Sequence, residues 1–333
     1  MLLGSSPLIG LDIGAGMVKA VTLRRKGNKL VVERAGLMAM PGGAISGRQI
    51  LDPPAVSDCV KRLCKDLGLR GRRTAVAVAG DEVTHVLLKV ERSSVEALEV
   101  LARQELGRVA PFPLEVALVD FQVLDNFSHS PWVDVVAVAA KRAAVERVEQ
   151  VLERAGKTVA IMDSTACALA NVFEINYQPA SNEITAMLHL GAATMTVCIL
   201  RGDTPLVVRD ITLDTTQPWR EQAGSAERVV VEFERVLEQM DEIADDHPLE
   251  PRSKQVSRLM LSGGGIRLRG LEDVLHARLR MPLEELNPFR NIEFAGSDAL
   301  GRLVWDHVHC MPVAAGLAMR GVDVPAAGSA VPG

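Results

Sequence analysis

The sequence predicts an α/β fold made of two similar halves, with a small α/β module inserted into the first half. Two repeats carry this prediction. An apolar stretch with a glycine-bearing turn, Leu11–Leu23, recurs at Met187–Leu200. An Ala-rich stretch recurs as well, at Thr165–Asn171 and Val313–Met319. A repeated pair of turn hairpin and small-residue helix indicates a duplicated domain with a cleft between the copies.

The hairpins correspond residue by residue. Setting Asp12 against His189 aligns Gly14 with Gly191, and both copies continue into alternating apolar residues. Glycine permits backbone conformations that other residues resist, and it leaves room for a ligand against bare backbone. Converging backbone N–H groups in such a turn bind anions, so phosphate is the expected guest. The alternative for any one of these turns is a plain β-hairpin.

Composition narrows the classes of protein. The 333 residues suffice for two domains, and 48% hydrophobic with 24% charged residues is ordinary for a globular chain. A net charge of -5 argues against a general nucleic-acid binder. We find no apolar run near the ~20 residues of a membrane helix, and the N-terminus lacks the basic start of a signal peptide. The five cysteines are scattered without a C-x-x-C pair, which favours a reduced, cytoplasmic compartment.

In the first half, residues 29–39 and 74–79 read as strands. Apolar residues at helical spacing predict a helix over 55–67, ended by Gly68. The module at 83–155 reads as a strand at 83–90, a helix after Ser93, two strands at 117–124 and 132–140, and a helix at 141–155. Ser93 and Glu96 form an expected capping box at the start of its first helix.

A strand at 158–163 leads into the first Ala-rich helix. The second half then continues with strands at 204–213, 256–261 and 282–286. Its expected helices are one at 225–245, one that ends at Leu279 and one at 311–320. Ser262–Ile266 is expected to turn directly from a strand into the helix that ends at Leu279, which would place bare backbone beside a helix N-terminus. The predicted domains are 1–82 with 156–178, the module 83–155, a second half at 179–321, and a disordered tail at 322–333.

Further motifs carry a family resemblance. They are Leu11–Gly14 with Val18–Val21, Ala110–Glu115 with Asp120–Leu124, Leu259–Gly265 with Leu268–Leu271, Asn287–Ile292 and Ala314–Ala318. The chain resembles the duplicated actin/Hsp70/sugar-kinase (ribonuclease H-like) ATPase fold. Within that fold it resembles the PilM family of type IV pilus assembly proteins, which is related to FtsA. The run Ala110–Glu115 is the more specific motif, because the whole fold family shares the glycine turns.

The resemblance implies ATP or ADP with Mg²⁺ in the central cleft. The candidate nucleotide contacts are Asp12, Gly14, Ala15, Gly16, Lys19, Gly191, Ala192, Gly263, Gly264 and Gly265, with Asp12 also the candidate metal ligand. It further implies an FtsA-type subdomain at 83–155 and a groove beside it that binds the N-terminal peptide of a PilN-like membrane protein. Such a protein would lie in the cytoplasm against the inner membrane and link motor proteins to the pilus platform.

Three departures from the family point to a weakened nucleotide site. His189 stands where the second turn usually has an aspartate, and a neutral imidazole is a poor ligand for Mg²⁺. The alternative is a hydrogen-bonded histidine near a strand end. Ala15–Met17 lack the hydroxyl groups that usually follow the glycine, and the link between Leu213 and Ser225 is short. Efficient phosphoryl transfer depends on positioned charge, so we expect little hydrolysis.

These features predict a scaffold that works by binding partners. The alternatives are an active ATPase or sugar-kinase relative that uses the same cleft, and the cytoplasmic part of a type II secretion platform protein. His307 and His309 are weak metal candidates on an expected strand, since two histidines alone do not complete a metal site.

Overall fold

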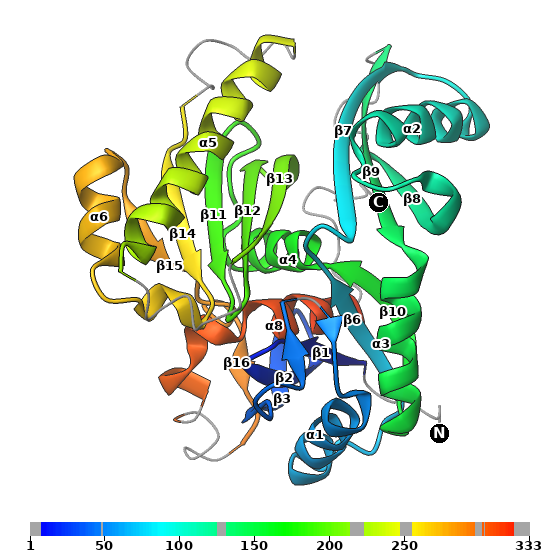
Figure 1. Ribbon diagram of the computed structural model, residues 1–333, viewed down its shortest axis with the longest axis vertical. Helices are drawn as coiled ribbons and strands as arrows, with labels where there is room; N and C mark the ends of the chain where they lie inside the picture. Colours follow the sequence, from blue (N-terminus) through cyan, green and yellow to red (C-terminus); the bar gives the residue numbers. More distant parts are fainter. Residues whose placement is uncertain are drawn as a thin grey trace.

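Two mixed β-sheets that share an order of five strands form the two halves of the chain, with β10-β6-β1-β2-β3 corresponding to β15-β14-β11-β12-β13 (Figure 1). The computed structural model describes residues 8–47, 49–124, 131–213, 223–246, 255–296, 302 and 304–322. The first sheet has the order β10-β6-β1-β2-β3-β16, and the second has the order β13-β12-β11-β14-β15. The first-sheet strands are β1 (Ile9–Ile13), β2 (Met17–Lys26), β3 (Lys29–Ala39), β6 (Arg73–Val78), β10 (Thr158–Ser164) and β16 (Glu293–Phe294). The second-sheet strands are β11 (Ile184–Leu190), β12 (Thr194–Arg201), β13 (Thr204–Thr212), β14 (Arg258–Ser262) and β15 (Leu283–Glu285).

The strand pairing confirms the duplicated α/β fold. β1 pairs antiparallel with β2 and parallel with β6, while β11 pairs antiparallel with β12 and parallel with β14. The Asp12 and His189 strands are therefore equivalent. β16 has no counterpart in this repeat: it comes from the second half of the chain but pairs with β3. Its two residues are too few to show a strand periodicity in the sequence.

The two Ala-rich helices, α4 (Thr165–Tyr177) and α8 (Pro312–Met319), pack against each other between the sheets (Figure 1). Every residue of α8 is buried. A Cβ on Gly316 would lie 1.9 Å from the Ala168 carbonyl oxygen, and one on Gly10 would lie 2.1 Å from the Ala314 oxygen. The small residues allow this close approach, which holds the two halves together between the sheets.

The outer helices each bury one apolar stripe on a sheet. They are α1 (Pro53–Asp66), α5 (Ser225–Asp246) and α6 (Leu271–Arg278). Asp52 caps α1 by accepting a hydrogen bond from the Ala55 amide at 2.9 Å. Val56, Val60 and Leu63 of α1 then pack with β1 and β2, while Phe233 of α5 lies in the core beneath β12 and β13.

The inserted module is built on a three-stranded sheet, β7-β9-β8. Its strands are β7 (Val83–Glu91), β8 (Ala117–Leu124) and β9 (Trp132–Lys141), and α2 (Val95–Val109) covers one face, followed by a 3₁₀ turn, η1 (Leu114–Val116). The expected capping box at Ser93 is wrong: Ser94 is the cap, and its hydroxyl accepts from the Ala97 amide at 3.3 Å. Ser93 instead donates to the Glu91 carbonyl.

The last helix of the 83–155 segment, α3 (Arg142–Arg154), packs largely on the first half. Val151 and Leu152 lie in the same core as Val56 of α1, and the Ser57 hydroxyl donates to the Val151 carbonyl at 3.0 Å. Sequence spacing alone does not reveal this, because an amphipathic stripe does not identify the surface it will cover. α3 therefore connects the small sheet to the first half.

The module also contacts the second half. Arg201 at the end of β12 forms an ion pair with Asp134 of β9 at 3.0 Å. Leu87 of β7 packs against the core of the second sheet, with β7 lying beside β13. The module thus touches both sides of the cleft.

Two further expectations need correction. His307 and His309 do not lie on a strand: His307 precedes the 3₁₀ turn η5 (Val308–Cys310), which contains His309. In the described residues no cluster of His, Cys, Asp and Glu could hold a metal ion. Of the expected tail, Val322 is described and packs against the core, and 323–333 lie outside the described residues. No helix in the described part of the chain is long and apolar enough to cross a membrane.

Candidate functional site

The two glycine turns face each other across the space between the sheets. Gly14 donates a backbone hydrogen bond to the Met17 carbonyl at 3.0 Å, and Gly191 donates the equivalent bond to Thr194 at 2.8 Å. A Cβ on Gly16 would lie 3.1 Å from the Cβ of Ala192. The structure therefore brings the two predicted phosphate-binding turns, including Ala15 between Gly14 and Gly16, to one place.

The reason for glycine in these turns is space and not backbone strain. Neither Gly14, Gly16 nor Gly191 belongs to the residues with positive φ. The expectation that Gly14 and Gly16 supply unusual backbone conformations is therefore wrong. At Gly14 a Cβ would lie 3.1 Å from the Met17 oxygen, so a side chain there would crowd the turn.

Asp12 and Lys19 occupy opposite positions on β1 and β2 and form an ion pair of 2.8 Å. Their side chains are only 16% and 12% exposed. The Lys19 ammonium also lies 3.4 Å from where a Gly14 Cβ would be, so it stands at the mouth of the turn. A cation beside open backbone suits a phosphate. Asp12 is less suited to Mg²⁺, since its carboxylate is already bonded to Lys19, and its metal role stays a prediction.

His189 pairs in register with Ser262 of β14, and its Nδ1 is hydrogen-bonded to the Ser262 hydroxyl at 2.9 Å. The side chain is buried. This geometry agrees with the alternative of a hydrogen-bonded histidine at a strand end. At this position of the second hairpin an imidazole therefore stands where the first hairpin has the Asp12 carboxylate.

The third glycine turn has a packing role at its first residue. Gly263 has φ of 85°, and a Cβ there would lie 2.3 Å from the Leu190 carbonyl oxygen. Its amide donates to the His309 carbonyl at 2.5 Å. The chain then forms a 3₁₀ turn, η4 (Gly264–Arg267), and α6 begins only at Leu271. The expected direct entry from Ser262–Ile266 into the helix is wrong, so the α6 N-terminus does not belong to this turn.

Asp163 is a cleft acid that sequence reasoning missed. It lies at the end of β10, opposite Ala77 of β6. On the other side of β6, Leu11 of β1 lies opposite Val76, so the next residue, Asp12, is level with Ala77. Asp163 and Asp12 are therefore level with each other and two strand spacings apart, about 10 Å. Its Oδ2 is buried without a hydrogen-bond partner in the described structure and lies 3.4 Å from Arg320 Nε. Burial raises the pKa of Asp163, and the Arg320 charge opposes that rise. An acid at the carboxyl end of a parallel strand was the available signal.

His85 joins the module to the same region. Its Nε2 is hydrogen-bonded to the hydroxyl of Ser164, the N-cap of α4, at 2.8 Å. Burial lowers the pKa of His85 to about 4, although the nearby Asp210 charge acts in the opposite direction. The imidazole is therefore neutral at pH 7.

A narrow groove of about 90 Å³ runs beside the first turn. Its walls come from the end of β6, from α3 and from the small ribbon of β4 (Ile45–Ser46) and β5 (Gln49–Ile50). The side chains that line it are mostly apolar: Leu11, Ile13, Ile45, Ile50, Val76, Ala77, Val78, Ala79, Ala144, Val148 and Thr194, with the ion pair of Glu82 and Arg147 at one side. Gly14 and Thr194 bring both glycine turns to its edge.

Comparison with known proteins covers nearly the whole chain. A family model described as type IV pilus assembly protein PilM matches residues 10–217 and 235–322. A solved PilM-PilN type IV pilus biogenesis complex matches with a TM-score of 0.77 and 24% identity, over 96% of this chain and 99% of the other. A Bacteroides thetaiotaomicron protein with an actin-like ATPase fold and unknown function matches with a TM-score of 0.50 and 10% identity, over 85% and 92% of the two chains. These structures show that the duplicated fold is actin-like.

Proposed function

Because this chain belongs to the family of type IV pilus assembly protein PilM, we propose that it is a scaffold of the pilus inner-membrane platform. It binds the N-terminal peptide of a PilN-like membrane protein in the groove between β6, α3 and the β4–β5 ribbon. It lies on the cytoplasmic side and reaches the inner membrane through that partner, where platform and motor proteins assemble on it.

The groove is the observation that carries the proposal. It is small, walled on several sides and lined mainly by apolar side chains, which suits a pocket for one of the apolar side chains of an extended peptide. It also lies beside α3, the helix that connects the inserted module to the first half. The solved complex that matches this chain over most of its length contains PilM with PilN.

The nucleotide cleft supports a binding role better than a catalytic one. Lys19 and the two turns offer a cation and backbone groups for phosphate. The Asp12 carboxylate is paired with Lys19, and position 189 carries an imidazole that is hydrogen-bonded to Ser262, so neither position offers a free carboxylate to Mg²⁺. Nucleotide binding without efficient hydrolysis is the function that this arrangement fits.

Calorimetry with a synthetic N-terminal peptide of a PilN-like protein tests the groove. Ile50→Glu places a charge on the apolar lining and is expected to weaken binding at least tenfold. Gln49→Glu, the exposed neighbour on the same ribbon, adds the same charge outside the lining and is the matched control. No binding by the unaltered protein, or equal binding by both variants, would contradict the proposal.

An active ATPase, or a sugar-kinase relative, is the second candidate. It is favoured by the shared turn hydrogen bonds and by Lys19 at the first turn. Steady phosphate release from ATP that falls in Lys19→Ala would support this enzyme and contradict a purely binding role. Release no faster than in Lys19→Ala would support the scaffold.

A further inference from the structure

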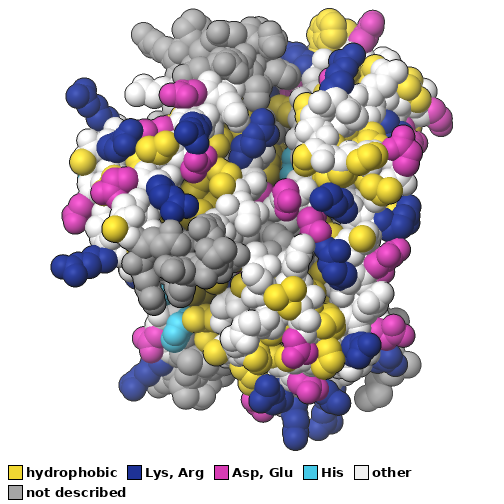
Figure 2. Space-filling model, in the orientation of Figure 1, with side chains coloured by type: hydrophobic (Ala, Val, Ile, Leu, Met, Phe, Trp, Pro, Cys, Tyr) yellow, Lys and Arg dark blue, Asp and Glu magenta, His cyan; other side chains and the backbone are white. Residues whose placement is uncertain are grey.

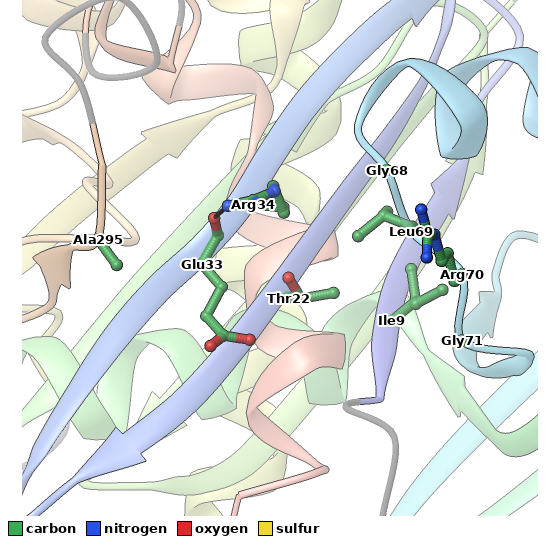
Figure 3. Close-up of a pocket in the computed structure, with 9 residues that line it drawn as sticks. All are labelled: Ile9, Thr22, Glu33, Arg34, Gly68, Leu69, Arg70, Gly71 and Ala295. Atoms are coloured by element: carbon green, nitrogen blue, oxygen red, sulfur yellow. Dashed lines mark hydrogen bonds between the residues drawn. The ribbon is translucent and has the colours of Figure 1, made fainter.

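A larger pocket, of about 360 Å³, lies at the far end of the first sheet from the glycine turns. Its floor is formed by Ile9 and Thr22, which are opposite each other on β1 and β2 (Figure 3). Arg34 of β3 stands opposite Thr22 on the next strand. The loop Gly68–Gly71, between α1 and β6, forms the other wall. None of the residues proposed for nucleotide or peptide binding lines this pocket.

Two guanidinium groups, one from each wall, dominate the chemistry of the pocket. Arg34 and Arg70 are both exposed. Neither forms an ion pair with another described residue, and Arg34 donates only to the Glu33 backbone carbonyl, at 2.7 Å. Guanidinium groups match phosphate oxygens in geometry as well as in charge.

Among the described residues that line the pocket, the one carboxylate is already neutralised. Glu33 forms an ion pair with Arg24 at 2.7 Å. In Figure 3 its carboxylate points away from both Arg34 and Arg70. The pocket therefore keeps an excess of positive charge.

A buried lysine holds the loop wall in place. Lys157 is 7% exposed, and its Nζ donates to the Leu69 carbonyl at 2.9 Å and to the Gly71 carbonyl at 2.7 Å. No described carboxylate forms an ion pair with it. The loop is thus preorganised, and a third positive charge lies directly beneath it.

The surface around the pocket is basic although the chain as a whole carries a net charge of -5. The segments next to the pocket, which are the end of β2, α1 and the chain after Gly71, carry exposed Lys and Arg side chains that form no ion pair with another described residue: Arg25, Lys26, Lys61, Arg62, Lys65, Arg72 and Arg73. They outnumber the exposed acids of α1, Asp58 and Asp66. Figure 2 shows Lys and Arg side chains gathered at the lower end of the molecule, where Figure 1 places α1. This asymmetry favours an extended anionic surface as the partner.

We propose that this end of the first half binds an anionic lipid membrane, with a headgroup phosphate between Arg34 and Arg70. The contact goes beyond the function proposed above, in which a partner protein supplies the attachment. It acts as a second, direct point of contact and fixes which end of the molecule faces the membrane.

Vesicle co-sedimentation of the full chain, without any partner, tests this contact. Binding is expected on phosphatidylcholine vesicles that contain 30% phosphatidylglycerol, but not on phosphatidylcholine alone. The double change Arg34→Ala with Arg70→Ala is expected to lower the partition coefficient about 25-fold, since each basic residue near an anionic surface contributes roughly fivefold. Arg103→Ala with Arg108→Ala removes the same charge from α2, away from the pocket, and should change little.

Three outcomes would overturn the proposal. One is equal vesicle binding by the two double variants. A second is binding of pyrophosphate, measured by calorimetry, with no binding to vesicles, which would indicate a soluble phosphate ligand. The third is binding to polyglutamate but not to vesicles, which would indicate an acidic protein partner. The changed side chains are all exposed, and unaltered thermal unfolding confirms that each variant is folded.

Discussion

Lys19 and Asp12 form an ion pair across the first hairpin, at 2.8 Å, where neither side chain is more than 16% exposed. The pair stands at the mouth of the turn whose Gly16 meets Ala192 of the second hairpin. Its first consequence is for stability, because removing one partner leaves a partly buried charge without compensation.

We therefore expect Lys19→Met to lower the free energy of unfolding by about 2 kcal/mol, the cost of an unsatisfied buried group. Urea unfolding measures the change, with Lys26→Met on the exposed end of the same hairpin as the control. Adding Asp12→Asn to Lys19→Met should recover part of the loss. A double variant no more stable than the single one would show that the pair is not coupled.

The contact between α4 and α8 makes a sharper prediction. Gly316→Ala would place a Cβ 1.9 Å from a backbone oxygen of α4, so we expect a loss of roughly 3 kcal/mol or more, because backbone has to move. Gly107→Ala in α2 would place its Cβ 3.6 Å from the nearest atom, an ordinary contact, and should gain up to about 1 kcal/mol. Both are measured by thermal or denaturant unfolding. Similar effects for the two substitutions would contradict the close packing.

His85 predicts a pH dependence of stability. Its pKa in the folded protein is about 4, below the ordinary value of 6.5, so the unfolded chain binds a proton that the folded chain excludes. Stability is therefore lost as the pH falls below about 6.5, by up to about 2 kcal/mol between pH 7 and pH 5 from this group. The comparison is with His85→Gln, which lacks the titrating group. Parallel pH profiles for the two proteins would refute this assignment.

The second turn can be tested by restoring an acid. His189→Asp places a carboxylate beside Gly191, and we expect ATP to bind on the order of tenfold more tightly with Mg²⁺ than without it, equivalent to ~1.4 kcal/mol. His189→Asn keeps a similar shape without the charge and should show no magnesium effect. Calorimetry with and without Mg²⁺ distinguishes them. A magnesium effect already present in the unaltered protein would mean that the imidazole does not weaken the site.

The repeats were the strongest guide to the fold. The two hairpins and the Ala-rich helices predicted the duplicated architecture, because equivalent strands carry equivalent apolar patterns. Long periodic segments were placed closely, and β3 has the predicted bounds of Lys29–Ala39. The two-residue β16 and the 3₁₀ turns η4 and η5 were missed, since such short elements depend on tertiary contacts.

The candidate site was only partly predictable. The sequence identified both turns and His189. It did not reveal that the Ser262 hydroxyl is hydrogen-bonded to the His189 imidazole, or that Lys19 forms an ion pair with Asp12. Asp163 was overlooked because its meaning comes from its neighbours on β6 and β1, which the linear order does not reveal. Gly263 was read as open to a ligand, whereas its φ of 85° and its contact with Leu190 already require glycine.

The small module determines how stiff the cleft is. It packs on the first half through α3, and it contacts the second half through the Asp134 ion pair and the Leu87 side chain. A rotation that separates Gly16 from Ala192 while the module stays with the first half would stretch the Asp134–Arg201 pair and expose Leu87 to water. These distant contacts therefore add to the resistance that the α4–α8 packing gives to opening, and loss of the Asp134–Arg201 pair would increase the thermal motion of a site that Asp134 does not contact.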